Sequence, residues 1–221
     1  MRGDRPYTPL AVERQPRFGC LFEVVETLVL TLVIFFVIQT FIAQPYQVQQ
    51  MSMEQTLEPS QYVLVDKLTP RFDAYKRGDI VVFKPPETWA SGDTPFIKRI
   101  IGVAGDRVEI RDDGLVYVNG TPLDEPYIYA DGDPPATEQT GDQDAWTVPD
   151  GDLFVLGDHR TQSADSRVFG PISQGDVIGR AFLRYFPFDA FGILKTPTYA
   201  ATGEALPSSA ASASPKPSTK P

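Results

Sequence analysis

Residues 96–110 read FIKRIIGVAGDRVEI, and this stretch decides what fold we expect for most of the chain. Residues 96–103 and 107–111 are rich in β-branched side chains, which favour strands. The Ala-Gly-Asp segment between them is typical of a tight turn. A strand, a turn and a second strand in so short a space indicate an antiparallel sheet.

The same pattern recurs on both sides of this stretch. Short apolar runs bounded by Pro, Gly or Asp occur at residues 61–69, 78–84, 115–118, 153–156 and 176–186. Asn119-Gly120 separates two apolar runs and predicts a hairpin turn. No strong helical period follows residue 43. The sequence therefore predicts an all-β domain of antiparallel sheets, either a partly open barrel or two packed sheets.

A long apolar segment precedes this domain. Residues 21–43 read LFEVVETLVLTLVIFFVIQTFIA, and no charged residue occurs between Thr27 and Met53. The segment is long enough to cross a bilayer core of roughly 30 Å. Residues 28–36 lack the polar face of a helix in a soluble protein, and no small-x-small cleavage site follows. We therefore expect residues 18–43 to be a transmembrane helix.

The basic residues predict its orientation. Arg2, Arg5, Arg14 and Arg17 precede the segment, and Lys67 is the first basic residue after it. The positive-inside rule then places residues 1–17 in the cytoplasm and residues 44–199 outside the cell membrane, as a single-pass protein. Residues 200–221 are a low-complexity stretch that we expect to be disordered.

Composition excludes several kinds of site. The net charge of −9 argues against nucleic acid as a partner. With one cysteine, Cys20, and one histidine, His159, neither a disulfide nor a Cys- or His-based metal site is expected. No cofactor is predicted.

An acidic segment follows the central stretch. Twelve Asp or Glu residues and no Lys or Arg lie between Arg111 and Arg160. We expect residues 112–150 to form an exposed hairpin or loop insertion. Asp131-Gly132-Asp133 suggests calcium, but the spacing is not that of an EF-hand.

Lys98 is a charged residue in the middle of an apolar strand. Strand alternation places it on one face with Phe96 and Ile100. It is either a surface lysine that extends into solvent or a buried lysine made neutral by desolvation. A neutral lysine can take a proton from a serine hydroxyl, and Ser52, about nine residues past the apolar segment, is a candidate nucleophile.

Polar side chains that could support Lys98 follow the strand at 153–156, in GDHRTQSADSRVFGP at residues 157–171. The hydroxyl of Ser163 can bind a neutral amine without charging it. A carboxylate beside the amine would raise its pKa. We therefore expect two pairs, Asp165 with Arg167 and Asp158 with Arg160, to stiffen this segment without touching Lys98.

Together these motifs resemble those of bacterial type I signal peptidase, or leader peptidase. The resemblance rests on an N-terminal anchor, S-M-x-x-T-L at Ser52, Lys-Arg at Lys98 followed by G-x-x-G-D, and G-D-x-R-x-x-S-x-D-S-R-x-F-G from residue 157. It covers residues 18 to 195, approximately. It implies a membrane-bound serine protease with a Ser/Lys dyad, which removes signal peptides from exported preproteins after small residues. Its partners would be signal peptides and the bilayer, close to the export translocase.

The resemblance also implies roles for individual residues. Ser52 is the nucleophile, and its backbone N–H is part of the oxyanion hole. Lys98 is the general base, which Ser163 orients. Asp165 and Arg167 hold the site together.

Three residues depart from the pattern of this family. Gln55 stands where proline is usual, and we expect a small effect. Gln50 stands where a hydroxyl residue often completes the oxyanion hole, and its amide is an alternative donor. His159 stands where asparagine is usual, which leaves open a triad of Ser52, His159 and an aspartate.

Substrate binding is predicted from strand alternation. A cleaved peptide must be extended, and residues 46–53 could offer it an exposed strand edge. Val48, Gln50 and Ser52 would share one face. The expected pockets for small side chains are lined by Val48, Met53, Leu57 and Ile97, although Leu57 could equally belong to the core.

Two other functions fit part of the sequence. A self-cleaving repressor also uses a Ser/Lys dyad, but it is soluble and binds DNA, which the apolar segment and the net charge of −9 oppose. An inactive or binding-only membrane-anchored β domain explains the segment and the strands. It does not explain why Ser52, Lys98 and the 157–171 segment occur together.

Overall fold

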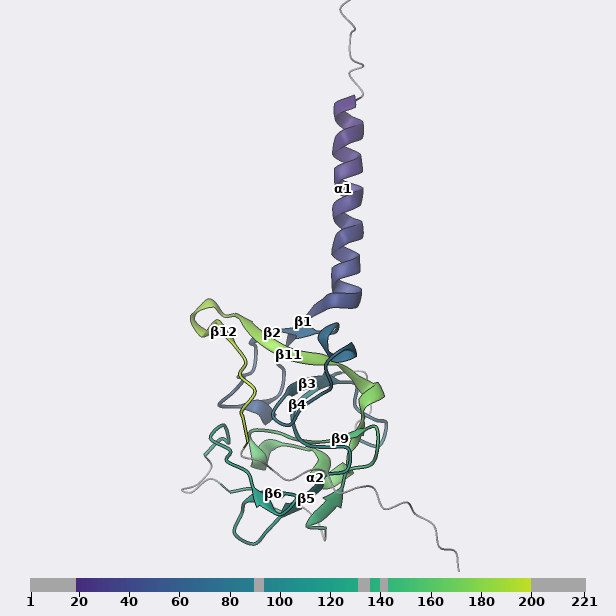
Figure 1. Ribbon diagram of the computed structural model, residues 1–221. Coiled ribbons are helices and arrows are strands. Elements are labelled where there is room, and N and C mark those ends of the chain that lie inside the picture. Colours follow the sequence, from purple (N-terminus) through teal and green to yellow (C-terminus); the bar gives the residue numbers. More distant parts are fainter. Residues whose placement is uncertain (1–18, 90–93, 131–135, 140–142, 200–221) are drawn as a thin grey trace, which may run out of the picture. The chain divides into compact units, whose positions relative to one another are not determined.

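The computed structural model describes residues 19–89, 94–130, 136–139 and 143–199 (Figure 1). Three expectations lie outside these ranges: the cytoplasmic residues 1–17, the tail 200–221 and the Asp131-Gly132-Asp133 motif. The chain divides into two compact units, Met1–Thr40 and Phe41–Pro221.

The first unit contains helix α1, Gly19–Val37, and the chain continues as a π-helix over Ile38–Ile42. The segment Leu21–Ile42 is long and apolar enough to cross a membrane. Apolar side chains from Leu21 onward are exposed all around the helix. The hydroxyls of Thr27 and Thr31 donate to the carbonyls of Glu23 and Thr27, so they satisfy their hydrogen bonds within the helix. Such a surface suits lipid better than water.

The second unit is built on a large antiparallel sheet. Its order is β1 (Ala43–Gln47), β2 (Tyr62–Asp66), β11 (Val177–Phe186), β3 (Ile80–Phe83), β4 (Phe96–Val103), β9 (Asp152–Leu156) and β10 (Ile172–Ser173). The short strand β12, Gly192–Ile193, also pairs with β11. The strands predicted around residues 61–69, 78–84, 96–103, 153–156 and 176–186 are therefore confirmed.

A second sheet has the order β7 (Thr121–Pro122), β6 (Val116–Val118), β5 (Arg107–Ile110) and β8 (Ala145–Thr147). Asn119 and Gly120 both have positive φ, 52° and 80°, which confirms the hairpin. The acidic segment is more than an exposed insertion. It supplies buried side chains to a core cluster, namely Val116, Val118, Leu123 and Trp146.

Short helices complete the second unit. Helix α2 covers Ser166–Phe169, and 3₁₀ turns cover Met51–Met53, Thr69–Arg71, Arg160–Gln162, Gln174–Asp176 and Phe188–Ala190. The turn Met51–Met53 bears Ser52, and the turn Arg160–Gln162 and helix α2 lie within the 157–171 segment.

Both faces of the large sheet are buried at β3 and β4. Ile80 and Val82 pack in one cluster with Ile97, while Val81 and Phe83 pack in another with Ile100. Neighbouring residues of β4 therefore point into different apolar interiors. Any charged side chain on this strand has to find its partners inside the protein.

Candidate active site

Lys98 and Ser52 meet in the interior. Lys98 pairs with Val81 across β3 and β4, and it is only 1% exposed, so the surface-lysine interpretation does not hold. Ser52 lies in the 3₁₀ turn and is 2% exposed. The Nζ of Lys98 is 2.7 Å from the Oγ of Ser52, across 46 residues of sequence. This is hydrogen-bond distance, as proton transfer requires.

The surroundings of Lys98 favour a neutral amine. Burial lowers its pKa to about 8, against the opposing influence of Asp165 and Asp158. Its second hydrogen bond goes to the carbonyl of Ile97 at 3.2 Å. Within the described ranges, no carboxylate forms an ion pair with the Nζ of Lys98. An amine in such a site is partly unprotonated at neutral pH, which a general base requires.

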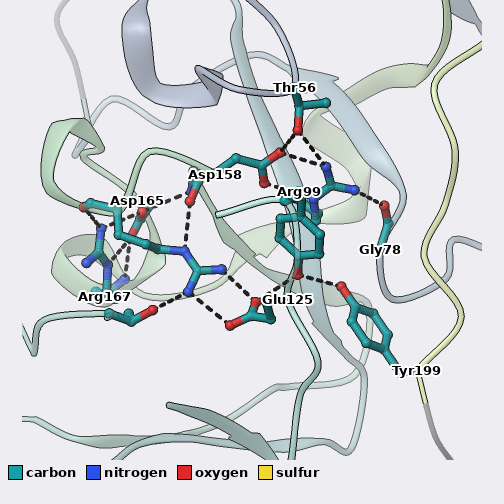
Figure 2. Close-up of polar contacts among 12 residues, drawn as sticks. Thr56, Gly78, Arg99, Glu125, Asp158, Asp165, Arg167 and Tyr199 are labelled. Carbon is teal, nitrogen blue, oxygen red and sulfur yellow. Dashed lines mark hydrogen bonds and ion pairs between the residues drawn. The ribbon is translucent and has the colours of Figure 1, made fainter. Parts of the chain in front are cut away.

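Arg99, the next residue of β4, has the opposite environment (Figure 2). Its guanidinium forms two hydrogen bonds with Asp158, of 2.8 Å from Nε and 2.6 Å from Nη2. A third goes to the carbonyl of Gly78 at 2.9 Å, and the ring of Tyr127 lies 3.9 Å from the guanidinium carbon. Thr56 donates to the same carboxylate at 2.5 Å. The partner of Asp158 is therefore Arg99, and the expected pairing with Arg160 is wrong.

Arg160 instead binds Glu125, which follows β7. Its Nη2 lies 2.6 Å from a Glu125 oxygen, its Nε donates to the carbonyl of Gly157 at 2.9 Å, and its Nη1 contacts the hydroxyl of Thr137. The carboxylate of Glu125 raises the pKa of Arg160, although burial opposes this. This pair joins the 157–171 segment to the segment between β7 and β8.

Asp165 and Arg167 form the expected pair (Figure 2). Arg167 donates to Asp165 from Nε at 2.8 Å and from Nη2 at 2.9 Å. Asp165 also accepts from the backbone N–H of Gly157 and caps helix α2. These donors occupy the oxygens of Asp165. Asp165 therefore raises the pKa of Lys98 only through its charge, without a direct contact.

Gly157 lies against Ser52. A β-carbon on this residue would be 2.5 Å from the carbonyl oxygen of Ser52 and 2.3 Å from the Oγ of Ser163. Only glycine allows so close an approach. The Oγ of Ser163 is buried and has no hydrogen-bond partner among the described residues, so its expected bond to Lys98 is not formed. A buried hydroxyl without a partner costs about 1–3 kcal/mol, so the role of Ser163 beside Lys98 stays a prediction.

Comparison with known proteins agrees with this geometry. A family model described as "Signal peptidase, peptidase S26" matches residues 21–186. The chain is 37% identical to "Probable signal peptidase I-2" of Synechocystis sp. over 184 residues, 82% of this chain and 81% of that protein. It is 36% identical to "Signal peptidase I" of Leptolyngbya laminosa, over 87% of this chain and 94% of that protein.

The chain belongs to the signal peptidase family, peptidase S26. A crystal structure of a signal peptidase I from Enterococcus faecalis V583 aligns with 34% identity and a TM-score of 0.39, over 49% of this chain and 97% of that one. Membership makes the chain a peptidase of signal peptide processing. A repressor or a binding-only domain is not favoured.

A surface pocket of this signal peptidase lies beside the loop that bears Ser52. Val48 and Ile97, two of the four predicted pocket residues, line it together with Gln50, whose side chain is exposed. The others, Met53 and Leu57, are 0% exposed and pack in the core. The remaining lining residues are Tyr46, Gln47, Gln49, Val63, Val82 and Pro95.

Gln55 has a backbone conformation that proline cannot adopt. Its φ is 76°, whereas the proline ring fixes φ near −65°. Its side-chain amide donates to the carbonyl of Pro126 at 3.2 Å, and its N–H donates to Glu58 at 3.3 Å. Gln55 therefore takes a turn conformation in the loop after Ser52, as expected, and its small effect on activity stays a prediction.

His159 is held by Glu54. Its Nδ1 lies 2.6 Å from a Glu54 oxygen, and its ring stacks on Tyr129 with centroids 4.2 Å apart. The Oγ of Ser52 pairs with Lys98 instead. This arrangement favours the dyad over a triad that uses His159.

The sequence analysis did not predict the contacts of Glu54, Thr56 and Glu125, or the buried ion pair of Arg99. The ion pair of Arg99 could have been expected from the sequence. A guanidinium in the middle of an apolar strand needs a carboxylate nearby, because an unpaired buried charge is costly. Nothing in the sequence indicates which carboxylate that is.

Proposed function

We propose that this signal peptidase cleaves signal peptides with Ser52 as nucleophile and Lys98 as general base. The 2.7 Å contact between Ser52 Oγ and Lys98 Nζ, in a site where burial lowers the pKa of Lys98 to about 8, carries the proposal. A serine hydroxyl is a weak nucleophile until a base takes its proton. Lys98 is within reach to do so.

The chemistry follows in two halves. Neutral Lys98 accepts the proton of Ser52 as Oγ attacks the peptide carbonyl, and a tetrahedral oxyanion forms. When this collapses, the peptide C–N bond breaks, and the Lys98 ammonium gives its proton to the leaving amine. Water then hydrolyses the ester on Ser52, with Lys98 again as the base.

Donors for the oxyanion are available at the nucleophile. Ser52 lies in the first turn of a 3₁₀ helix, where backbone N–H groups have no acceptor within the helix. The exposed amide of Gln50 can supply a second donor. The unpartnered hydroxyl of Ser163 can orient the amine of Lys98 by a rotation of its side chain.

The substrate pairs with the edge of the large sheet in this proposal. Strand β1 is paired on one side by β2 and ends the sheet. An extended peptide that added a strand there would place alternate side chains toward Val48 and Ile97. The pocket is small, which suits small side chains. Met53 and Leu57 support it from the core.

The proposal also places the enzyme at the outer surface of the cell membrane. Helix α1 spans the bilayer, residues 1–17 lie in the cytoplasm, and residues 44–199 lie outside, near the export translocase. The distribution of arginines supports this orientation. A membrane-impermeant protease added to intact spheroplasts should digest the catalytic domain. Protection of the domain would contradict the orientation.

The catalytic assignment is tested by cleavage of a preprotein with the full-length enzyme in liposomes. Ser52→Ala and Lys98→Ala should each lower kcat by about 10³-fold or more. Glu109→Gln is a matched control, because its carboxylate binds exposed arginines in the small sheet. Unchanged cleavage by Ser52→Ala would overturn the proposal.

A further inference from the structure

Every second residue of the loop that bears the proposed nucleophile contacts Asp158 or His159. The carbonyl of Ser52 accepts from the backbone N–H of His159 at 3.1 Å. The carboxylate of Glu54 meets Nδ1 of His159 at 2.6 Å, and Thr56 donates to Asp158 at 2.5 Å. His159 therefore makes two of these three contacts, one from its backbone and one from its ring.

The histidine ring is fixed on a second side. Tyr129 stacks on it with 24° between the ring planes, and the N–H of Tyr129 donates to the carbonyl of Asp158 at 3.0 Å. The side chains of His159 and Glu54 are 8% and 17% exposed. An ionised carboxylate offers only acceptors, and with Glu54 in that form Nδ1 of His159 is the donor of this bond. A bond to a carboxylate in such a shielded place is strong and directional.

We infer that Glu54 and His159 form a positioning pair for the nucleophile. The pair holds the ring of His159, the backbone of His159 holds the carbonyl of Ser52, and the orientation of that carbonyl sets the direction of the Ser52 side chain toward Lys98. Neither residue exchanges a proton with the substrate. This inference rests on the proposed function, in which Ser52 is the nucleophile.

The expected effect follows from the short distances at the dyad. Proton transfer needs Ser52 Oγ to remain near 2.7 Å from Lys98 Nζ. A displacement of about 1 Å can cost up to a hundredfold in rate. Loss of the pair should therefore lower kcat, while KM should change little, because the pocket at Val48 and Ile97 lies elsewhere.

Two substitutions of His159 separate its bond from its stacking. His159→Phe keeps a ring to stack on Tyr129 and removes the donor. His159→Asn keeps a donor near the position of Nδ1 and removes the ring. We expect kcat to fall about tenfold in His159→Phe and to stay within about threefold of wild type in His159→Asn.

Substitution of the partner tests the coupling. Glu54→Met should match His159→Phe, and the double variant should be no slower than either single variant, since both remove the same bond. All variants are measured as the full-length enzyme in liposomes, with thermal unfolding recorded for each and Glu109→Gln as control. KM should remain within about twofold throughout.

Several results would overturn the inference. The effects of the single variants could multiply in the double variant, or kcat could fall equally in His159→Phe and His159→Asn. The losses of kcat could also follow losses of thermal stability from variant to variant, which would indicate a structural role. Should His159→Phe be as inactive as Lys98→Ala while still folded, His159 would be a base. Ser52→Ala separates these results from failure of the dyad itself.

Discussion

Lys98 and Arg99 are consecutive residues of β4, yet their surroundings shift the pKa values of the two side chains in opposite directions. Both are almost fully buried, at 1% and 2% exposed. Arg99 faces a carboxylate that holds it by two hydrogen bonds, and its pKa is raised. Lys98 faces a hydroxyl and a carbonyl, and burial lowers its pKa to about 8. The partners of a buried cation, more than its depth, decide whether it keeps its proton.

The two sites also differ in what they do for stability. A lysine whose pKa falls from 10.5 to about 8 costs the folded state roughly 3 kcal/mol at neutral pH. The charges of Arg99 and Asp158 neutralise each other in the interior. Burial therefore destabilises the folded state only when one of the two partners is removed. In the proposed mechanism, the face of the strand at Lys98 serves catalysis, and the face at Arg99 serves structure.

The largest effect is expected when lysine and arginine are exchanged at positions 98 and 99. Lys98→Arg places a permanently charged group at the dyad, so no base remains, and kcat should fall about 10³-fold or more. Preprotein cleavage by the full-length enzyme measures this. Arg99→Lys is the matched variant: it keeps a cation beside Asp158 but loses the two-bond contact, so stability should fall while kcat stays far above that of Lys98→Arg. An active Lys98→Arg enzyme would refute the general-base role.

Removal of the Arg99 guanidinium should show how much the ion pair with Asp158 matters for stability. Arg99→Met leaves Asp158 buried without its cation, and the free energy of unfolding should fall by about 3–5 kcal/mol. Urea denaturation followed by tryptophan fluorescence measures this loss. A double variant with Asp158→Leu should recover part of it, since no unpaired charge remains. If the double variant were less stable than Arg99→Met, the ion pair would not be the cause.

The pH dependence of cleavage should follow Lys98 alone. The base must be neutral, so kcat/KM should rise with pH and level off above a pKa of about 8. Between pH 6 and pH 8 the expected rise is roughly fiftyfold, from the fraction of neutral lysine. Arg99 keeps its proton throughout and contributes nothing. A profile that levelled off two pH units lower would argue against Lys98 as the base.

The smallest expected effect is on stability at the catalytic face. Lys98→Met removes a charge that burial disfavours, so at pH 7 the inactive variant should be more stable by about 1–3 kcal/mol. The folded-state pKa is below the unfolded value, so wild-type stability should rise with pH between about 8 and 10.5. Lys98→Met should lack this rise. Chemical denaturation of both proteins across this range checks it.

Local patterns in the sequence predicted what local interactions determine. The main strands, the Asn119-Gly120 turn and the Asp165–Arg167 pair, two residues apart, all follow from neighbouring residues. The partners of Arg99 and Arg160 lie 59 and 35 residues away, and only the folded topology brings them together. No periodicity in the sequence records such pairings.

The pocket illustrates another limit of sequence reasoning. Strand alternation was applied to residues 46–53, but β1 ends at Gln47 and the chain turns into a 3₁₀ helix at Met51. Strict alternation fails where the strand ends, so Met53 points into the core and away from the pocket. Val48 and Ile97 line it as expected, because each lies in or beside a regular strand.

The close approach at Gly157 has a consequence for how this enzyme can evolve. Every single-nucleotide change in a glycine codon that alters the residue adds a β-carbon, and here any β-carbon collides with the backbone of Ser52. Selection should therefore hold this position constant across generations. At position 159, the contact with Glu54 is made by the side chain alone. This position can therefore change during evolution when the new side chain keeps a hydrogen-bond donor for Glu54.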